Sequence, residues 1–298
     1  MLPEEIVSAE LIEKGWSVDR KYCLTLKNAE KRLLRITPHD KKKDRKQLFL
    51  MMQKVADLGV PTCKALELGE CEQGTYLIYE WIDGEDAETV VPYLPKQEQY
   101  RLGVQSGKIL KKIHSVPAPE STEEWSARFS KKADRNIRLY RECPLSFDGA
   151  EEIINYLNQN RSLLKNRPQC FHHGDYHIGN MMIANGGLVV IDFDRFDFGD
   201  PWEEFNRIVW CAQKVPIFGA GMIDGYFDCS VPQEFWKTLA FYIGSNMLSS
   251  LPWAVPFGEK QIEVMLRQAK EVMGWYQNFT TVFPSWYRQS KQEIWEKI

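Results

Sequence analysis

The sequence predicts an α+β protein of two lobes, a small β-rich lobe followed by a larger lobe made mostly of helices. Its 298 residues correspond to about two domains of roughly 150 residues each. Strand-type runs are concentrated in the first 80 residues, whereas helix-type periodicity dominates the remainder. The turn signal Asp83-Gly84 lies between these regions. We therefore expect an N-lobe over residues 1–82 and a C-lobe over residues 83–298.

Two pairs of strands and one helix are expected in the N-lobe. The strands are predicted over 18–26, 31–37, 64–69 and 75–81, and the helix over 40–58. Asn28-Ala29-Glu30 and Glu72-Gln73-Gly74 supply the turns within the two pairs. Gly59 and Pro61 end the helix.

The C-lobe reads as a series of helices with one β-type interruption. Helices are expected near 97–115, 149–165, 202–214, 232–250, 259–278 and 285–297, and the interruption spans 181–191. A small β lobe and a helical lobe would enclose a cleft, which is where small-molecule sites usually lie.

The composition excludes several classes of protein. With 44% hydrophobic residues, 38 basic and 41 acidic residues, the chain is that of an ordinary globular protein with a net charge of −3. That balance supplies no basic field for nucleic acid, and the one basic run, Lys41-Lys42-Lys43, is flanked by acids. No apolar run reaches the roughly 18 residues of a membrane span, and the acidic N-terminus does not resemble a signal peptide. Seven cysteines without a C-x-x-C pair indicate a reduced, cytoplasmic protein.

The stretch from His172 to Asp194 carries the chemistry. Asn185-Gly186-Gly187 is a tight-turn signal with β-type residues on both sides. A three-residue loop there would pair residue 184 with 188 and place Asn180 opposite Asp192. Asp175 lies in the loop that leads into the first strand. Carboxylate and amide oxygens gathered in this way form a hard-oxygen site, and Mg²⁺ is its natural occupant.

The spacing of these residues also fits the kinase arrangement of a catalytic Asp, an Asn five residues later and a second, metal-binding Asp. His173-Gly174-Asp175 with Asn180, then Ile191-Asp192-Phe193 and Gly199-Asp200-Pro201, strongly resembles the aminoglycoside phosphotransferase/choline kinase superfamily. The resemblance implies a protein-kinase-like fold and phosphoryl transfer to a small molecule. It makes Asp175 the catalytic base or hydroxyl orienter and Asn180 and Asp192 the Mg²⁺ ligands, with His173 supporting the loop.

The resemblance further implies that ATP or GTP binds between the lobes. Ser17, in Gly15-Trp16-Ser17, would donate to the phosphates, and Arg35 stands where kinases usually carry a strand lysine. Main-chain groups of Glu80 and Ile82 would bind the base. The helix glutamate that usually steadies the strand cation is not evident, because Gln47 or Leu48 falls near its place and Asp44 is the nearest acid.

The acceptor of the phosphate is expected to be a cationic small molecule. Residues 169–205 hold seven acids and one base. Asp194, Asp197, Glu203 and Glu204 are the acids left over to bind an amino-sugar or an amino alcohol. Acids are also favoured at a helix start without any ligand. Seven of the ten tryptophans follow residue 200 and would form either an aromatic wall or helix core.

Three other hypotheses stay open from the sequence. The same machinery would serve a choline, amino-alcohol or other metabolite kinase instead of an aminoglycoside kinase with a role in antibiotic resistance. A nucleotide-binding pseudokinase is favoured by Arg35 and by the missing helix glutamate. Zinc could be held by Cys170 with His172, His173 and His177, although this loop has no helix signal. The sequence does not fix the acceptor, the base preference or the oligomeric state.

Overall fold

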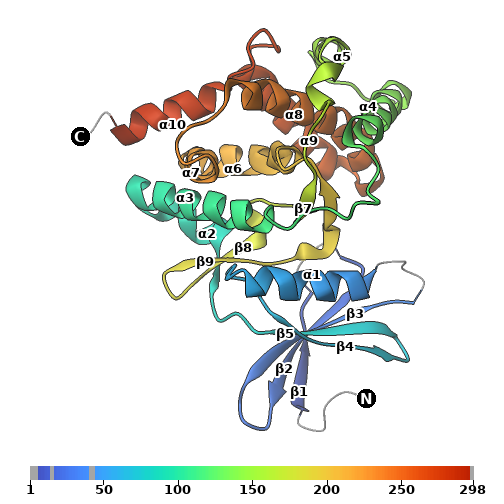
Figure 1. Ribbon diagram of the computed structural model, residues 1–298, viewed down its shortest axis with the longest axis vertical. Coiled ribbons are helices and arrows are strands. Elements are labelled where there is room, and N and C mark those ends of the chain that lie inside the picture. Colours follow the sequence, from blue (N-terminus) through green and yellow to red (C-terminus); the bar gives the residue numbers. More distant parts are fainter. Residues whose placement is uncertain (1–5, 14–16, 40–43, 296–298) are drawn as a thin grey trace. The chain divides into compact units, whose positions relative to one another are not determined.

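The computed structural model describes residues 6–13, 17–39 and 44–295. It divides into two compact units, each composed of two chain segments (Figure 1). Unit 1 comprises Met1–Ala87 and Asn180–Asp194, and unit 2 comprises Glu88–Gly179 and Arg195–Ile298. The first boundary thus falls five residues beyond the expected end of the N-lobe. The segment after Gly179, which we expected in the C-lobe, is part of unit 1.

Unit 1 is built on an antiparallel sheet of five strands in the order β1-β2-β3-β5-β4. The strands are β1 (Ile6–Leu11), β2 (Arg20–Leu26), β3 (Lys31–Thr37), β4 (Ala65–Cys71) and β5 (Gly74–Glu80), and the helix α1 (Arg45–Asp57) lies between β3 and β4 in the chain. The expected strands and helix are all present. The edge strand β1 was not predicted, because only Ile6 of its six residues is even partly buried and it has no strand-type apolar face.

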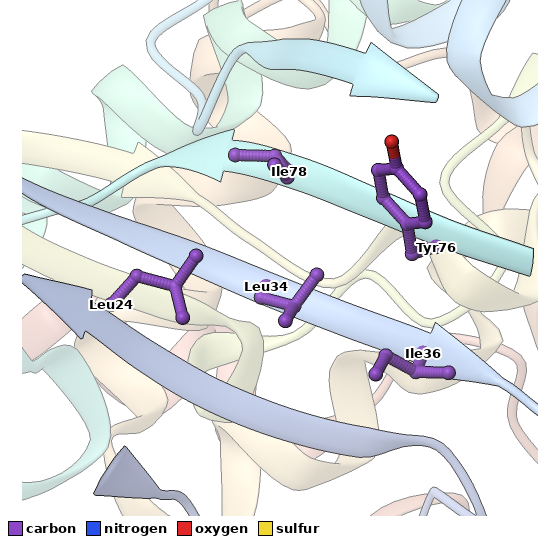
Figure 2. Close-up of a cluster of buried hydrophobic side chains, with 5 residues drawn as sticks. All are labelled: Leu24, Leu34, Ile36, Tyr76 and Ile78. Atoms are coloured by element: carbon purple, nitrogen blue, oxygen red, sulfur yellow. The ribbon is translucent and has the colours of Figure 1, made fainter. Parts of the chain in front are cut away.

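Alternation along the strands gives the sheet two different faces. Even-numbered side chains of β2, β3 and β5 form an apolar cluster, drawn in Figure 2, that comprises Leu24, Leu34, Ile36, Tyr76 and Ile78. Odd-numbered side chains point to the opposite face. Lys21 and Arg35 lie there as a cross-strand pair, and the side chain of Arg45 from α1 reaches the same face, where its Nε donates to Thr37 Oγ1 at 2.6 Å. The sheet therefore presents charged groups on the face that α1 covers.

A second, three-stranded sheet explains why Asn180–Asp194 belongs to unit 1. Its order is β6-β8-β9, with β6 (Glu85–Asp86), β8 (Met181–Ala184) and β9 (Gly187–Val190). Val190 N–H donates to Pro61 O at 2.9 Å, and the Thr62 hydroxyl donates to Val190 O at 2.8 Å. The hairpin is thus tied through backbone and side-chain hydrogen bonds to the segment that joins α1 to β4.

Unit 2 is mainly helical. Its α-helices are α2 (Ala87–Val90), α3 (Lys96–Ile113), α4 (Trp125–Glu142), α5 (Ala150–Gln159), α6 (Ile208–Lys214), α7 (Pro216–Tyr226), α8 (Gln233–Ala254), α9 (Glu259–Trp275) and α10 (Ser285–Trp295). The short strands β7 (Cys170–His172) and β10 (Asp197–Gly199) pair antiparallel. One-turn 3₁₀ segments, among them η5 (Glu203–Arg207), join several of these elements. No helix in the described part of the chain has the length and apolar character needed to cross a bilayer.

Glycine allows α3 and α7 to pack closely. A Cβ on Gly107 would lie 2.0 Å from Met222 O, and one on Gly225 would lie 2.2 Å from Val104 O. Such distances leave room only for a hydrogen at these positions. Gly219, Gly221 and Gly225 lower the helix propensity of residues 216–226, which is why α7 was not predicted. Helix α4 was missed because its buried stripe includes a polar residue, Asn136.

Candidate functional site

The loop that follows β7 is shaped by one glycine. Gly174 has φ +87°, and a Cβ at this position would lie 1.8 Å from Arg195 O. Only glycine fits that combination of backbone conformation and close approach. The backbone then turns so that the next residue, Asp175, carries its carboxylate out of the buried strand, with a side-chain exposure of 20%.

A buried carboxylate, Glu204, holds this loop from behind. It accepts hydrogen bonds from His173 N–H at 2.9 Å and from Gly174 N–H, and His114 Nε2 lies 3.1 Å from its Oε2. Burial alone would raise the pKa of Glu204, but the hydrogen bond to His114 and the neighbouring His172 lower it to about 2. Burial also lowers the pKa of His114, so we assign a neutral imidazole that donates from Nε2. Glu204 is therefore ionised at neutral pH and fixes the backbone before Asp175.

Asp175 is surrounded by basic side chains of unit 2. Arg207 Nε lies 3.2 Å from its Oδ1, and Arg195 Nη1 lies 3.6 Å from its Oδ2. His177 Nε2 is 3.8 Å from Oδ1, but burial lowers the pKa of His177 to about 4, so this ring is neutral at pH 7. Asp175 N–H donates to His173 Nδ1 at 3.2 Å, so His173 contacts the backbone of the loop that it was expected to support. The positive charge beside Asp175 is supplied by the two arginines.

The hairpin that carries Asn180 and Asp192 closes with a tighter turn than expected. Asn185 has φ 51° and Gly186 has φ 73°, the positive values required by a two-residue turn of type I′. Ala184 therefore pairs with Gly187 and Met181 with Val190. The expected three-residue loop was wrong by one position, so Asn180 lies opposite Ile191, whose N–H donates to Asn180 O at 3.0 Å. Asp192 follows directly, and its φ of +66° ends the ladder.

These two residues fit a hard cation. Both offer oxygen atoms, one amide and one carboxylate, and both lie at the open end of the same hairpin. The Asp192 side chain is 44% exposed, and its Oδ1 accepts from Arg35 Nη1 at 2.8 Å. Amide and carboxylate oxygens are the donor types that a Mg²⁺ ion would need.

Arg35 is the centre of a buried arginine–carboxylate cluster, which we define as Arg35, Arg45, Asp19, Asp192 and Asp194. Its Nε donates to Asp19 Oδ2 at 2.6 Å, and its Nη2 lies 2.7 Å from Asp194 Oδ2. The pKa of Arg35 is raised: its burial acts against this, but Asp192, Asp194 and Asp19 more than compensate. Arg35 therefore stays charged although it is 7% exposed.

The acid that binds Arg35 comes from the bend before β2 and not from helix α1. Asp19, whose side chain has 0% exposure, binds both Arg35 and Arg45. Helix α1 contributes the cation Arg45, which also binds Asp194. The sequence interpretation missed Asp19 and Arg45. The available signal was that Asp19, Lys21 and Arg35 all fall on the same face of the predicted strands, an unusual place for three charges.

The remaining predicted nucleotide-binding residues lie in unit 1. Ser17 Oγ accepts from Arg35 Nη2 at 2.9 Å and from Asp19 N–H at 3.2 Å, which leaves the hydroxyl proton able to donate. Its predicted neighbours Gly15 and Trp16 lie outside the described residues. Glu80 ends β5 and donates its N–H to Lys64 O at 2.9 Å. Ile82 follows in the connection to β6, outside the sheet.

The four acids expected to bind the acceptor are engaged with donors of the protein. Asp194 binds Arg35 and Arg45 in unit 1. In unit 2, Glu204 binds the loop backbone, Lys132 Nζ lies 2.9 Å from Glu203 Oε1, and Arg128 Nη1 lies 3.3 Å from Asp197 Oδ1. None of them stands apart as a site for a polycation.

Zinc has no suitable site among the residues named for it. Within the described residues, the one cluster of ligand-type atoms joins His114, Cys170 and His172. Both ring nitrogens of His114 are already used, by Glu204 and by the Tyr226 hydroxyl at 3.0 Å. Burial raises the pKa of the Cys170 thiol well above its usual range.

A cavity of about 160 Å³ adjoins the loop of Asp175 in unit 2. We call it the polar cavity, because most of its lining side chains are charged or form hydrogen bonds. It is lined by Phe129, Lys132, His172, Gly174, Arg195, Asp197, Glu203, Asn206, Arg207, Tyr242, Ser245 and Asn246. Arg207, which lines the cavity, also contacts Asp175.

A comparison with protein families identifies the class of enzyme. Residues 8–240 match the model of the phosphotransferase enzyme family (APH), which is most of the chain. The chain belongs to this family. The predicted enzyme class, a small-molecule phosphotransferase, is thereby confirmed. No curated protein matches the sequence.

Solved structures confirm the kinase-like α+β fold. An aminoglycoside phosphotransferase, APH(4)-Ia, in its apo form is 15% identical, with a TM-score of 0.66 over 90% of this chain and 94% of that chain. A choline/ethanolamine kinase family protein from Mesorhizobium loti is 15% identical, with a TM-score of 0.65 over 94% and 92%. The amicoumacin kinase hAmiN, in complex with AMP-PNP, Ca²⁺ and amicoumacin, is 14% identical, with a TM-score of 0.62 over 94% and 91%. At these identities the similarity is one of fold.

Proposed function

We propose that the phosphotransferase moves the γ-phosphoryl group of ATP or GTP, with Mg²⁺ bound, to a hydroxyl of a small molecule. The observation that carries the proposal is the way the catalytic loop is built. Buried Glu204 fixes the backbone at His173 and Gly174, and Asp175 extends from that loop beside two arginines. A carboxylate held in this manner is preorganised to orient a hydroxyl.

Asp175 accepts the proton of the acceptor hydroxyl as its oxygen attacks the γ-phosphorus. The bond between the γ-phosphorus and the β–γ bridging oxygen breaks, and the nucleoside diphosphate leaves. Positioning and charge stabilisation supply most of the acceleration in such reactions. Arg207 and Arg195, which lie 3.2 and 3.6 Å from the carboxylate, hold it in one orientation.

Asn180 and Asp192 would hold the Mg²⁺ ion. When bound, the ion neutralises charge on the phosphate oxygens. Arg35 contacts Asp192 now, at 2.8 Å, and in the proposal it also meets the phosphates, with Asp19 keeping its guanidinium in place. Ser17 donates its hydroxyl proton to a phosphate oxygen, and the main chain at Glu80 and Ile82 binds the base.

The pseudokinase hypothesis rested on Arg35 in place of the usual strand lysine and on the missing helix glutamate. Buried Asp19 supplies an acid for Arg35 at 2.6 Å, so only the replacement of lysine still favours this hypothesis. Choline, amino-alcohol and amino-sugar kinases remain as alternatives for the acceptor. A cytoplasmic location stays part of the proposal, supported by seven cysteines that are all free thiols.

The test is a transfer assay with both nucleotides. Radiolabelled ATP and GTP are offered in turn with aminoglycosides, choline, homoserine and neutral sugars, with Mg²⁺ and with excess chelator. We expect labelled product from at least one acceptor and none with chelator present. Nucleotide binding without transfer to any acceptor would instead favour the pseudokinase.

A further inference from the structure

Four of the five members of the arginine–carboxylate cluster form a closed ring of alternating charge, which we call the charge ring: Arg35, Asp19, Arg45 and Asp194. Asp19 Oδ2 accepts from Nε of Arg35 at 2.6 Å and from Nη2 of Arg45. Asp194 Oδ2 lies 2.7 Å from Nη2 of Arg35, and its Oδ1 accepts from Nη1 of Arg45. No side chain of the ring is more than 10% exposed. Each guanidinium thus binds both acids, and each acid binds both guanidinium groups.

The charge ring is neutral, and Arg35 connects it to more exposed groups. Two positive and two negative side chains balance within the ring. The Nη1 of Arg35 donates to Oδ1 of Asp192 at 2.8 Å, and the Asp192 side chain is 44% exposed. The Nη2 of Arg35 also donates to Ser17 Oγ at 2.9 Å. Arg35 therefore joins the buried ring to the residues proposed to bind the metal and the phosphates.

Arg45 supplies half of the positive charge of the ring from helix α1. Its Nε donates to Thr37 Oγ1 at 2.6 Å, and its two terminal nitrogens bind Asp19 and Asp194. Contacts at all three nitrogens fix the guanidinium in one orientation. Without Arg45 the two acids would face Arg35 alone, and the ring would carry an excess of negative charge. Because buried charges are screened much less than exposed ones, this excess would act on any anion that approaches Arg35.

We propose that Arg45 is a positioning residue for the nucleotide. It neutralises Asp19 and Asp194, so that Arg35 keeps its positive charge available to the phosphate groups. Arg45 acts through the two acids and does not itself have to touch the nucleotide. The inference rests on the proposed function, in which Arg35 meets the phosphates. It gives helix α1 a cation as its contribution to this site, where the sequence interpretation looked for an acid.

A purely structural role for Arg45 predicts a different behaviour. Removing one partner of a buried ion pair destabilises a protein whether or not a ligand is bound. A distorted site would then bind the base, the ribose and the phosphates of a nucleotide less well. The proposed role affects the phosphates alone. ADP and adenosine share the base and the ribose, so a comparison of their affinities separates the two roles.

The variant Arg45→Gln tests the role of the charge. Binding of ADP and of adenosine to the full-length protein is measured by calorimetry, with excess chelator so that no metal contributes. We expect ADP to bind ten-fold or more weakly than to the parent protein, and the affinity for adenosine to stay within two-fold. Lys46→Gln is the matched control, because Lys46 is the next residue of α1 and is exposed. It should leave both affinities unchanged.

A charge-balanced double variant distinguishes charge from packing. Arg45→Gln combined with Asp194→Asn removes one positive and one negative group, so the remaining pair of Arg35 and Asp19 is neutral again. We expect its ADP affinity to return to within three-fold of that of the parent protein. Replacing both partners of a buried pair disturbs a fold less than removing one, so this variant keeps the test decisive if Arg45→Gln alone does not fold. Arg45→Lys retains the charge and should also bind ADP within three-fold of the parent.

Three results would overturn the positioning role of Arg45. They are an unchanged ADP affinity in Arg45→Gln, an equal loss of ADP and adenosine binding in that variant, and a loss of ADP affinity of ten-fold or more in the double variant. The proposed function is judged separately, by the transfer assay on the parent protein. Transfer by the parent together with any of these three results leaves the function standing and removes the role of Arg45. A parent protein that binds ADP no more tightly than adenosine and transfers phosphate to no acceptor counts against the function itself.

Discussion

Asp19 and Glu204 are both buried carboxylates, and the two units hold them in opposite ways. Asp19 lies between two cations, Arg35 and Arg45. Glu204 is held by two backbone N–H groups and a neutral imidazole. In unit 1 a buried charge thus positions another charge, whereas in unit 2 a buried charge positions the backbone. The proposed metal ligand Asp192 depends on the first arrangement, and the proposed base Asp175 depends on the second.

The largest effect on turnover is expected at Asp175, the residue that depends on the backbone held by Glu204. Asp175→Asn should lower kcat by about 10²–10⁴, the range for loss of a positioned acid or base. Folding should be retained, because Asp175 is 20% exposed and asparagine has nearly the same shape. Turnover, thermal melting and nucleotide affinity are measured on the same preparation. Full turnover in this variant would remove Asp175 from the reaction.

The next largest effect tests how buried Asp19 holds Arg35 and Arg45 in unit 1. Asp19→Asn should destabilise unit 1 by about 3–5 kcal/mol, because removing one partner of a buried ion pair leaves the others uncompensated. Denaturant unfolding measures the loss. Asp44→Asn is the control, since Asp44 is an exposed N-cap that accepts from Gln47 N–H at 2.7 Å, and Asn caps equally well. Equal stability of the two variants would mean that Asp19 does not hold the arginines.

The variant Glu204→Gln tests the role of the buried carboxylate in unit 2 through the pH dependence of stability. The carboxylate has a pKa of about 2 in the folded protein and 4.5 ordinarily. A lowered pKa contributes stability that is complete above about pH 4.5 and is lost as the pH falls towards about 2. Glutamine offers one acceptor oxygen for two backbone donors, so the variant should be less stable by about 1–3 kcal/mol at neutral pH. The difference between variant and parent should shrink between about pH 4.5 and 2. A difference independent of pH would show that Glu204 is not ionised.

Local sequence patterns predicted much of this molecule and missed what depends on distant residues. Strand alternation and helix periodicity predicted the α+β lobes. The motifs that contain Asp175, Asn180 and Asp192 carried the family resemblance, which implied the kinase-like fold and the enzyme class that are now confirmed. The pairing of Asp19 with Arg45 joins residues 26 positions apart, and no local period encodes it. The role of Glu204 was misjudged for the same reason. An acid near a helix start resembles a solvated residue until the fold places it against the backbone of the loop that carries Asp175.

The smallest predicted effect concerns the turn that sets the register of Asn180 and Asp192. Gly186 has φ 73°, and a Cβ there would meet nothing within 4 Å, so Gly186→Ala adds backbone strain without a clash. The left-handed conformation costs a residue with a side chain about 1–2 kcal/mol. We expect a loss of stability of that size, and no change in the Mg²⁺ concentration needed for half-maximal turnover. A marked rise in that concentration would mean that the strain is relieved by a shift to the three-residue loop, which moves Asn180 by one position against Asp192 and couples the turn directly to the metal site.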